Sequence, residues 1–176
     1  EVMTKLRNGQ GQPIVTHVML TDLCNHSCAF CSVQKRAGDS LQFKVIEAYL
    51  AILMTYGLKA VILSGGGNPI LYKCKHSGAD FNDVVSYCTN IGLEVGLITN
   101  GMPLIPYCLS IDAKKWRLSW KTVTPDTLDR LTWIRVSMSG FDHKENEVYV
   151  PDIDPERTTL GFSYVAHDIY REPADP

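Results

Sequence analysis

Three cysteines lie close together in the segment LTDLCNHSCAFCSV (20–33), at Cys24, Cys28 and Cys31, with the spacing C-x3-C-x2-C. Closely spaced cysteines are typical of metal sites, and a cubane iron–sulfur cluster normally takes four thiolate ligands. Three thiolates would leave one iron without a protein ligand, and an open metal position can bind a substrate or a cofactor. The spacing therefore indicates a metal centre with one position open to a small molecule.

A closed zinc site is an alternative interpretation, and it needs four protein ligands. His26 lies inside the cysteine motif, and Cys74 with His76 is the nearest further pair of possible ligands. Because these residues do not reproduce the paired spacing of zinc ligands, zinc is the weaker fit. Cys88 lies on the apolar face of a predicted helix and Cys108 matches no ligand pattern, so both are expected to be buried small side chains.

Five short runs rich in apolar residues have the length of strands. They are residues 14–21, 59–64, 93–99, 133–138 and 159–166. Because each run is almost continuously apolar, we expect strands that are buried on both faces, as in a parallel sheet. His17 lies within the first run and is therefore expected to be a core histidine.

Helical patterns separate these runs. Apolar residues recur at helical spacing in 41–56 and in 80–91, and a glycine follows each pattern. Thr124 and Pro125 match the first residues of another helix, whereas 102–123 is interpreted as a loop with at most a short helix. Strands that alternate with helices predict βα units, so the chain is expected to have an α/β fold, a partial barrel of about five units.

Three further motifs end the second, third and fourth predicted strands. They are LSGGGNP (63–69), LITNG (97–101) and IRVSMSG (134–140). Because ligands gather at the carboxyl ends of parallel strands, we expect these motifs to lie beside the cysteines. In the first motif, Gly65, Gly66 and Gly67 permit positive φ angles and a close approach of the backbone to a ligand.

Polar side chains also mark the ends of the later strands. Thr99 and Asn100 either contact a cofactor or substrate, or cap the turn that Gly101 completes. Ser137 lies in an apolar strand, where a buried hydroxyl needs a partner. Arg135 is expected to face the other side of the sheet and to form a salt bridge with a helix.

The cysteine spacing, the aromatic Phe30 before the third cysteine and the three strand-end motifs together resemble the radical S-adenosylmethionine (SAM) superfamily. The resemblance implies that Cys24, Cys28 and Cys31 hold three irons of a [4Fe–4S] cluster, while SAM chelates the fourth through its amino and carboxylate groups. One electron, from an external reductant of the flavodoxin or ferredoxin type, would cleave SAM to methionine and a 5′-deoxyadenosyl radical. That radical would abstract a hydrogen from the substrate.

The resemblance also implies which residues contact SAM. They are Phe30, Gly65, Gly66, Gly67, Asn68, Thr99, Asn100 and Ser137. Asn68 departs from the family pattern, which often has glutamate here; an amide can accept a hydrogen bond from an ammonium group but adds no charge. The substrate is not indicated beyond a preference for a peptide, a protein or a small metabolite. A non-catalytic metal-binding or iron–sulfur electron-transfer module is the alternative function.

The family core usually has six βα units, and five are predicted here. The single core domain expected over 1–176 is therefore incomplete at its C-terminal end or unusually short. Tyr164, His167 and Asp168 follow the fifth strand and are possible substrate contacts.

The composition agrees with one soluble globular domain, because 45% of the 176 residues are hydrophobic and 20% are charged. The net charge of −2 offers no basic surface, so nucleic acid is not an expected partner. No apolar run reaches the ~18 residues of a spanning helix, and no membrane association is expected. Clustered cysteines favour a reducing cytoplasm over a secreted disulfide scaffold.

Overall fold

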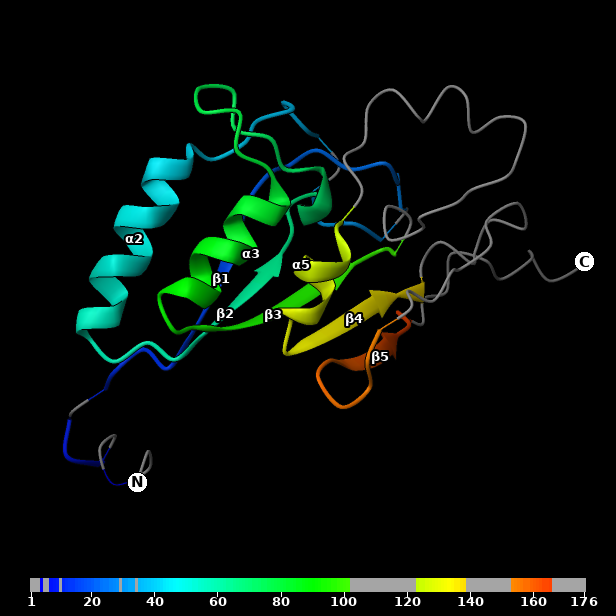
Figure 1. Cartoon of the computed structure of the whole chain (residues 1–176). Coiled ribbons are helices and arrows are strands. Elements are labelled where there is room, and N and C mark those ends of the chain that lie inside the picture. Colours follow the sequence, from blue (N-terminus) through cyan, green and yellow to red (C-terminus); the bar gives the residue numbers. More distant parts are fainter. Residues whose placement is uncertain are drawn as a thin grey trace, which may run out of the picture.

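The computed structural model of the protein describes residues 4, 7–9, 11–28, 30–33, 35–101, 123–138 and 153–165. Five strands in this part of the chain form one sheet, in which neighbouring strands follow chain order and run parallel (Figure 1). They are β1 (Val15–Met19), β2 (Ala60–Ser64), β3 (Glu94–Thr99), β4 (Trp133–Ser137) and β5 (Thr159–Ser163). Each lies within the range predicted for it, so the α/β fold is confirmed.

The helices also begin and end close to their predicted positions. They are α2 (Phe43–Thr55), α3 (Phe81–Asn90) and α5 (Pro125–Asp129), with a short 3-10 helix η1 (Pro69–Leu71) that was not predicted. Thr124 caps α5 as expected, because its side-chain oxygen accepts a hydrogen bond from the backbone N–H of Thr127 (3.2 Å). The predicted loop 102–123 lies outside the described residues except for its last residue.

The helices lie along one side of the sheet in Figure 1. Right-handed crossovers between parallel neighbours in chain order place every helix on the same face, which is the arrangement of a βα barrel. The central strands and α3 form the middle of the core. Its residues with no exposed surface are Val61, Leu63, Val84, Val85, Cys88, Val95 and Leu97. The buried position predicted for Cys88 is thus confirmed.

The edge strands β1 and β5 are not buried on both faces, contrary to the prediction. In β1 only Val18 is buried, and His17 is exposed, with its Nδ1 3.3 Å from the hydroxyl of Ser64. Expecting a core histidine here was therefore wrong. Successive strand residues point to opposite faces, and His17 points to the face opposite the helices. An apolar run alone does not distinguish an edge strand from a central one.

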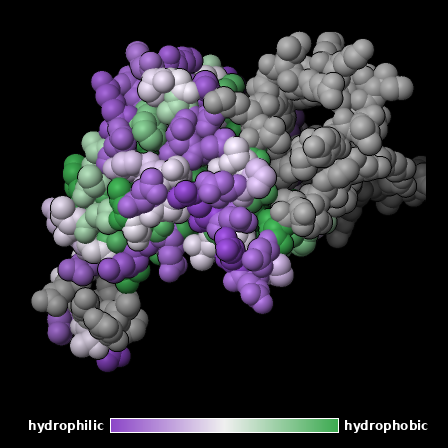
Figure 2. All heavy atoms as spheres, viewed as in Figure 1, coloured by the Kyte–Doolittle hydropathy of each residue, from purple (hydrophilic) through white to green (hydrophobic). Residues whose placement is uncertain are grey.

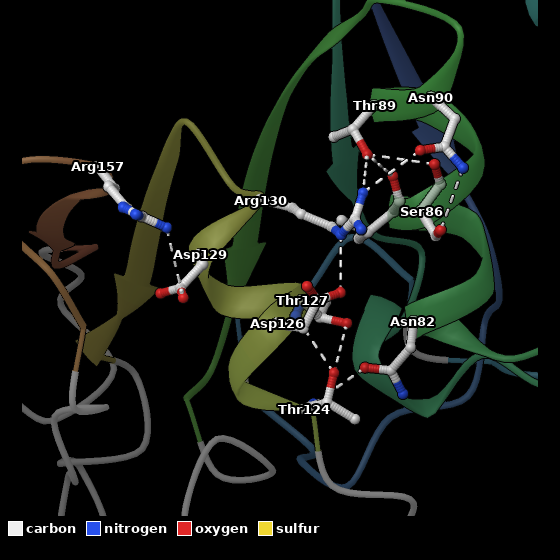
Figure 3. Close-up of polar contacts among 11 residues, drawn as sticks. Asn82, Ser86, Thr89, Asn90, Thr124, Asp126, Thr127, Asp129, Arg130 and Arg157 are labelled. Carbon is white, nitrogen blue, oxygen red and sulfur yellow. Dashed lines mark hydrogen bonds and ion pairs between the residues drawn. The ribbon is translucent and has the colours of Figure 1, made fainter.

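Polar contacts join α5 to α3 (Figure 3). The guanidinium of Arg130, which follows α5, donates hydrogen bonds to Thr89 Oγ1 (3.3 Å) and Asn90 Oδ1 (3.4 Å). At the other end of α5, the backbone N–H of Thr124 donates to Asn82 Oδ1 (3.0 Å). Because α5 leads into β4, these contacts fix the position of β4 beside β3.

The outer surface of α2 carries apolar side chains, and Figure 2 shows hydrophobic residues in view over this helix. Val45, Tyr49, Ile52 and Tyr56 are exposed, while the opposite side of α2 buries Ile46 and Leu50. No helix within the described ranges is long and apolar enough to cross a membrane.

Candidate functional site

The loop that follows β1 holds the three cysteines (residues 22–33, the cysteine loop) and packs against the turn that follows β2. The backbone N–H of Gly67 donates a hydrogen bond to Thr21 O (3.0 Å), just before the loop. The backbone N–H of Asn68 donates to Leu23 O (2.7 Å) within the loop. These two bonds hold the first residues of the cysteine loop against the carboxyl end of β2.

That turn (residues 65–68, the glycine turn) needs glycine because the backbones approach closely. A Cβ atom on Gly67 would collide with the carbonyl group of Leu23, and one on Gly65 would collide with the backbone of Gly67. None of Gly65, Gly66 and Gly67 has a positive φ angle. The predicted close approach is therefore found, although it is to the cysteine loop, and positive φ angles are not what these glycines provide.

Side-chain amides connect the cysteine loop, the glycine turn and the end of β3. We call Asn25, Asn68, Asn100 and the hydroxyl of Thr99 the amide cluster. Asn68 Nδ2 donates to Asn100 Oδ1 (2.8 Å) and Asn25 Oδ1 (3.2 Å), and Asn100 Nδ2 also donates to Asn25 Oδ1 (2.8 Å). Thr99 Oγ1 donates to Asn68 Oδ1 (2.9 Å). Three of the four predicted motifs therefore meet at one edge of the sheet.

Asn68 lies at the centre of this cluster and is only 2% exposed. Its Oδ1 accepts a second hydrogen bond from the backbone N–H of Ile70 (3.3 Å), so both acceptor positions of the amide oxygen are occupied. Thr99 Oγ1 in turn accepts from the backbone N–H of Gly101 (3.1 Å), which has φ 79°. Capping of this turn, one of the two roles predicted for Thr99, is thus confirmed.

Asn25 was missed as a functional candidate, although it directly follows the first cysteine. Its Oδ1 accepts two hydrogen bonds within the amide cluster. Its Nδ2 is buried and has no hydrogen-bond partner. A buried amide donor without a partner is costly, so this group is available to an acceptor that enters the site.

Cys24, Cys28 and Cys31 are partly buried, and none of them forms a disulfide bond. The backbone N–H of Cys31 donates to Cys28 O (3.0 Å), which makes a turn between these two cysteines. Within the described residues, no three His, Cys, Asp or Glu side chains converge closely enough to hold a metal ion.

Hydrogen bonds of Thr21 and Asp22 with residues 37–39 connect the two ends of the segment that contains the cysteines. The carboxylate of Asp22 accepts hydrogen bonds from the backbone N–H groups of Ala37 and Asp39, both at 2.7 Å. The hydroxyl of Thr21 donates to Asp39 O (2.8 Å). These bonds join the two ends of the segment that contains the cysteines, so its position does not depend on a bound metal alone.

Arg36 extends over the third cysteine of the loop. Its Nη2 donates a hydrogen bond to Cys31 Sγ (3.2 Å), and its Nη1 donates to His26 O (3.3 Å). The Nε atom of Arg36 is buried without a partner. Arg36 lies in none of the short sequence motifs, so local patterns do not mark it.

Cys74 and His76, the possible fourth ligands of a zinc site, lie elsewhere. Cys74 is 3% exposed and packs in the hydrophobic core, where its Sγ accepts a hydrogen bond from the backbone N–H of Phe43 (3.5 Å). Hydrogen bonds from the side chain and backbone of Ser77, and then from Phe43, lower the pKa of Cys74 to about 6. His76 is exposed. Cys74 is therefore a residue of the hydrophobic core and is not part of the cysteine loop.

The face of the sheet opposite the helices, here called the open face, is partly polar. Its polar residues include His17, Ser64, Arg135, Ser137 and Ser163. Ser137 is half-buried, and Ser163 lies beside it on β5. Expecting Arg135 on the other side was wrong, because residues two apart in a strand share a face. Arg135 is exposed, and no carboxylate of the described residues forms a salt bridge with it.

The remaining predicted positions are only partly described. Phe30 is half-buried in the cysteine loop, and Tyr164 is 58% exposed directly after β5. Cys108, His167 and Asp168 lie outside the described residues.

Comparisons with known proteins agree with this arrangement, although no protein-family model matches the chain. The chain is similar to an S-adenosylmethionine-dependent nucleotide dehydratase from Selenomonas ruminantium, with 29% identity over 82 residues. This match covers 47% of the chain and 28% of the dehydratase.

Among solved structures, the chain is similar to SuiB of Streptococcus suis, in one structure bound to the precursor peptide SuiA and in another bound to S-adenosylmethionine. Both matches have a TM-score of 0.55 and 19% identity. They cover 88% and 89% of the chain, but only 31% and 32% of SuiB. The chain thus spans less than a third of the length of these relatives.

These matches confirm the predicted resemblance to the radical SAM superfamily. SuiB is a radical SAM enzyme, and the five-stranded sheet corresponds to part of its barrel. The fold is therefore the partial βα barrel that the sequence predicts.

Proposed function

We propose that the protein is a radical SAM enzyme in which Cys24, Cys28 and Cys31 bind a [4Fe–4S] cluster. The observation that carries this proposal is the amide cluster, which joins the cysteine loop, the glycine turn and the end of β3 by side-chain hydrogen bonds of 2.8–3.2 Å. Its position at the carboxyl edge of a parallel sheet is where βα folds bind cofactors.

The residues of the site fit these cofactors. Three cysteines outside any disulfide bond lie in one loop, and soft thiolate ligands suit iron–sulfur clusters. Two buried donors, Asn25 Nδ2 and Arg36 Nε, lack partners and lie in or beside the cysteine loop. A group that brings negative charge and acceptor atoms would satisfy them, and both a thiolate-bound cluster and the carboxylate of SAM do so.

When bound, the reduced cluster supplies the electron that cleaves SAM into methionine and a 5′-deoxyadenosyl radical. The role of the chain's own residues is to bind the cofactors and to orient them. The glycine turn offers backbone without side chains at the edge where SAM would lie, and Asn68 holds this turn in place. Phe30, Thr99, Asn100 and Ser137 are the proposed side-chain contacts to SAM.

The two relatives differ in the molecules that their names mention, so they support only a broad class of substrate. SuiB is bound to a precursor peptide in one structure, and the similar dehydratase is named for nucleotides. We therefore propose a peptide, a protein or a small metabolite as substrate. An external one-electron reductant of the flavodoxin or ferredoxin type, a cytoplasmic location and one core domain over 1–176 complete the proposal.

Anaerobic reconstitution with iron and sulfide, followed by reduction and addition of SAM, tests this function. The protein is expected to bind about four irons per chain and to release 5′-deoxyadenosine. Cys24→Ala, Cys28→Ala and Cys31→Ala should each abolish product formation. His76→Ala is the matched control and should retain both the cluster and the product.

The alternative, a non-catalytic metal or electron-transfer module, predicts the opposite pattern. It requires a fourth protein ligand, so a variant such as His76→Ala or His26→Ala would lose metal. It also predicts that the reconstituted protein forms no 5′-deoxyadenosine. Either result would exclude the radical SAM function.

A further inference from the structure

Arg36 is a partly buried cation that has no carboxylate partner among the described residues. Its two terminal nitrogens donate to Cys31 Sγ (3.2 Å) and His26 O (3.3 Å), and its Nε is buried and unpaired. Burying a guanidinium without a nearby anion is unfavourable. The positive charge of Arg36 therefore has no counter-ion among the described residues.

The two acidic residues of the segment that contains the cysteines (21–40), Asp22 and Asp39, do not supply this charge. The carboxylate of Asp22 accepts hydrogen bonds from the backbone N–H groups of Ala37 and Asp39. The carboxylate of Asp39 points to solvent and lies 3.9 Å from Lys75 Nζ. Among the described groups to which Arg36 donates hydrogen bonds, only the sulfur of Cys31 can become an anion.

We propose that Arg36 is the counter-ion of the iron–sulfur cluster and that it raises the reduction potential of the cluster. This inference rests on the proposed function, because it takes Cys31 as a cluster ligand. Hydrogen bonds to the sulfur atoms and net charge are two of the factors that set cluster potentials. Arg36 supplies both at one ligand, and it acts through Cys31 rather than on SAM or substrate.

The direction of the effect follows from charge. Reduction adds one electron to a cluster that is already anionic. A cation next to a ligand sulfur stabilises the reduced state more than the oxidised state. Removing the positive charge at Arg36 should therefore make the cluster harder to reduce, so its midpoint potential should become more negative.

A purely structural role is the competing explanation, because Arg36 also bridges to the carbonyl oxygen of His26. Loss of such a bridge would loosen the loop and lower the iron content, but it would leave the potential of any assembled cluster unchanged. The midpoint potential therefore separates the two roles, and it can be measured without SAM, substrate or turnover.

The experiment is an EPR-monitored redox titration of the reconstituted protein, with iron content measured in parallel. Arg36→Gln should lower the midpoint by about 59 mV, which corresponds to a change on the order of tenfold in the one-electron equilibrium. Arg36→Lys keeps the charge but loses the planar fork, so its shift should be smaller and in the same direction. Arg157→Gln, an exposed cation paired with Asp129 and Asp154, is the control and should not shift.

Equal midpoints in the wild type and Arg36→Gln, at equal iron content, would overturn the inference. If Arg36→Gln assembles no cluster, the midpoint potential of Arg36→Lys provides the test. An Arg36→Lys midpoint identical to that of the wild type would then overturn the inference. A wild-type protein that takes up no iron–sulfur cluster would instead refute the proposed function, and thus the two failures are distinguishable.

Discussion

The side-chain amide of Asn100 donates a 2.8 Å hydrogen bond to the side-chain oxygen of Asn25, although the two residues are 75 positions apart. Asn25 lies between the first two cysteines, and Asn100 follows β3. Their contact fixes the cysteine loop relative to the third strand without any bound group. The amide cluster therefore connects the cysteine loop, the glycine turn and the end of β3 in the protein without metal.

Replacing Asn25 by alanine tests the role of this contact in the protein without metal. The variant leaves Asn100 Nδ2 without its acceptor and removes one of two acceptors of Asn68 Nδ2. We expect the free energy of unfolding to fall by about 1–3 kcal/mol. Urea denaturation measures this value. Asn8→Ala, at an exposed amide with no side-chain hydrogen bond to the described residues, should change it by less than ~0.5 kcal/mol, and equal stabilities of the two variants would contradict the prediction.

The glycine turn offers a matched pair of substitutions. A Cβ atom on Gly67 would collide with Leu23 O, whereas one on Gly66 would meet its nearest atoms, in Thr21 and Asp22, at 3.8 Å. Gly67→Ala should therefore displace the cysteine loop and strongly lower the iron content after reconstitution, while Gly66→Ala should retain it. Iron analysis of the two variants side by side checks this, and equal iron contents would show that the close approach is not required.

Thiol alkylation distinguishes the cysteines of the loop from a core cysteine. Burial raises the pKa of Cys88 to about 12, and the side chain has no exposed surface. In the native protein without metal, an alkylating reagent should modify Cys24, Cys28 and Cys31 but not Cys88. Mass spectrometry of the labelled peptides measures this at neutral pH. Rapid native labelling of Cys88 would contradict its position in the core.

Ser137 tests the proposed SAM contacts on the fourth strand. Ser163 lies beside it in register on β5 and provides a matched control. One hydrogen bond contributes about 0.5–1.5 kcal/mol. Because Ser137→Ala would lose one such bond to SAM, we expect SAM binding to weaken by about two- to tenfold at unchanged iron content. Ser163→Ala should bind SAM like the wild type. Calorimetry with the reconstituted protein measures both affinities, and unchanged binding by Ser137→Ala would remove Ser137 from the site.

The strands and most of the site could be predicted from sequence because local patterns determine them. Continuous apolar runs identified all five strands, and strand-end motifs identified Asn68, Thr99 and Asn100 as neighbours of the cysteine loop. The partner of these residues, Asn25, could not be found in this way. Its role depends on a contact across 75 residues, and no local pattern marks an asparagine that will bond to distant amides.

Two errors have a common physical origin. His17 was expected in the core and Arg135 on the side of the helices, but both lie on the open face. An apolar run indicates that a strand is buried on average. It does not indicate which elements cover each of the two faces of that strand. Strict alternation of side chains along β4 would have placed Arg135 on the same face as Ser137.

Under the proposed function, the three cysteines leave one iron of the cluster open to SAM. The EPR spectrum of the reconstituted, reduced protein with and without SAM tests this arrangement. We expect the signal of a reduced four-iron cluster that changes when SAM is added. A cluster signal that SAM does not alter, or a protein that binds zinc in place of iron, would contradict it.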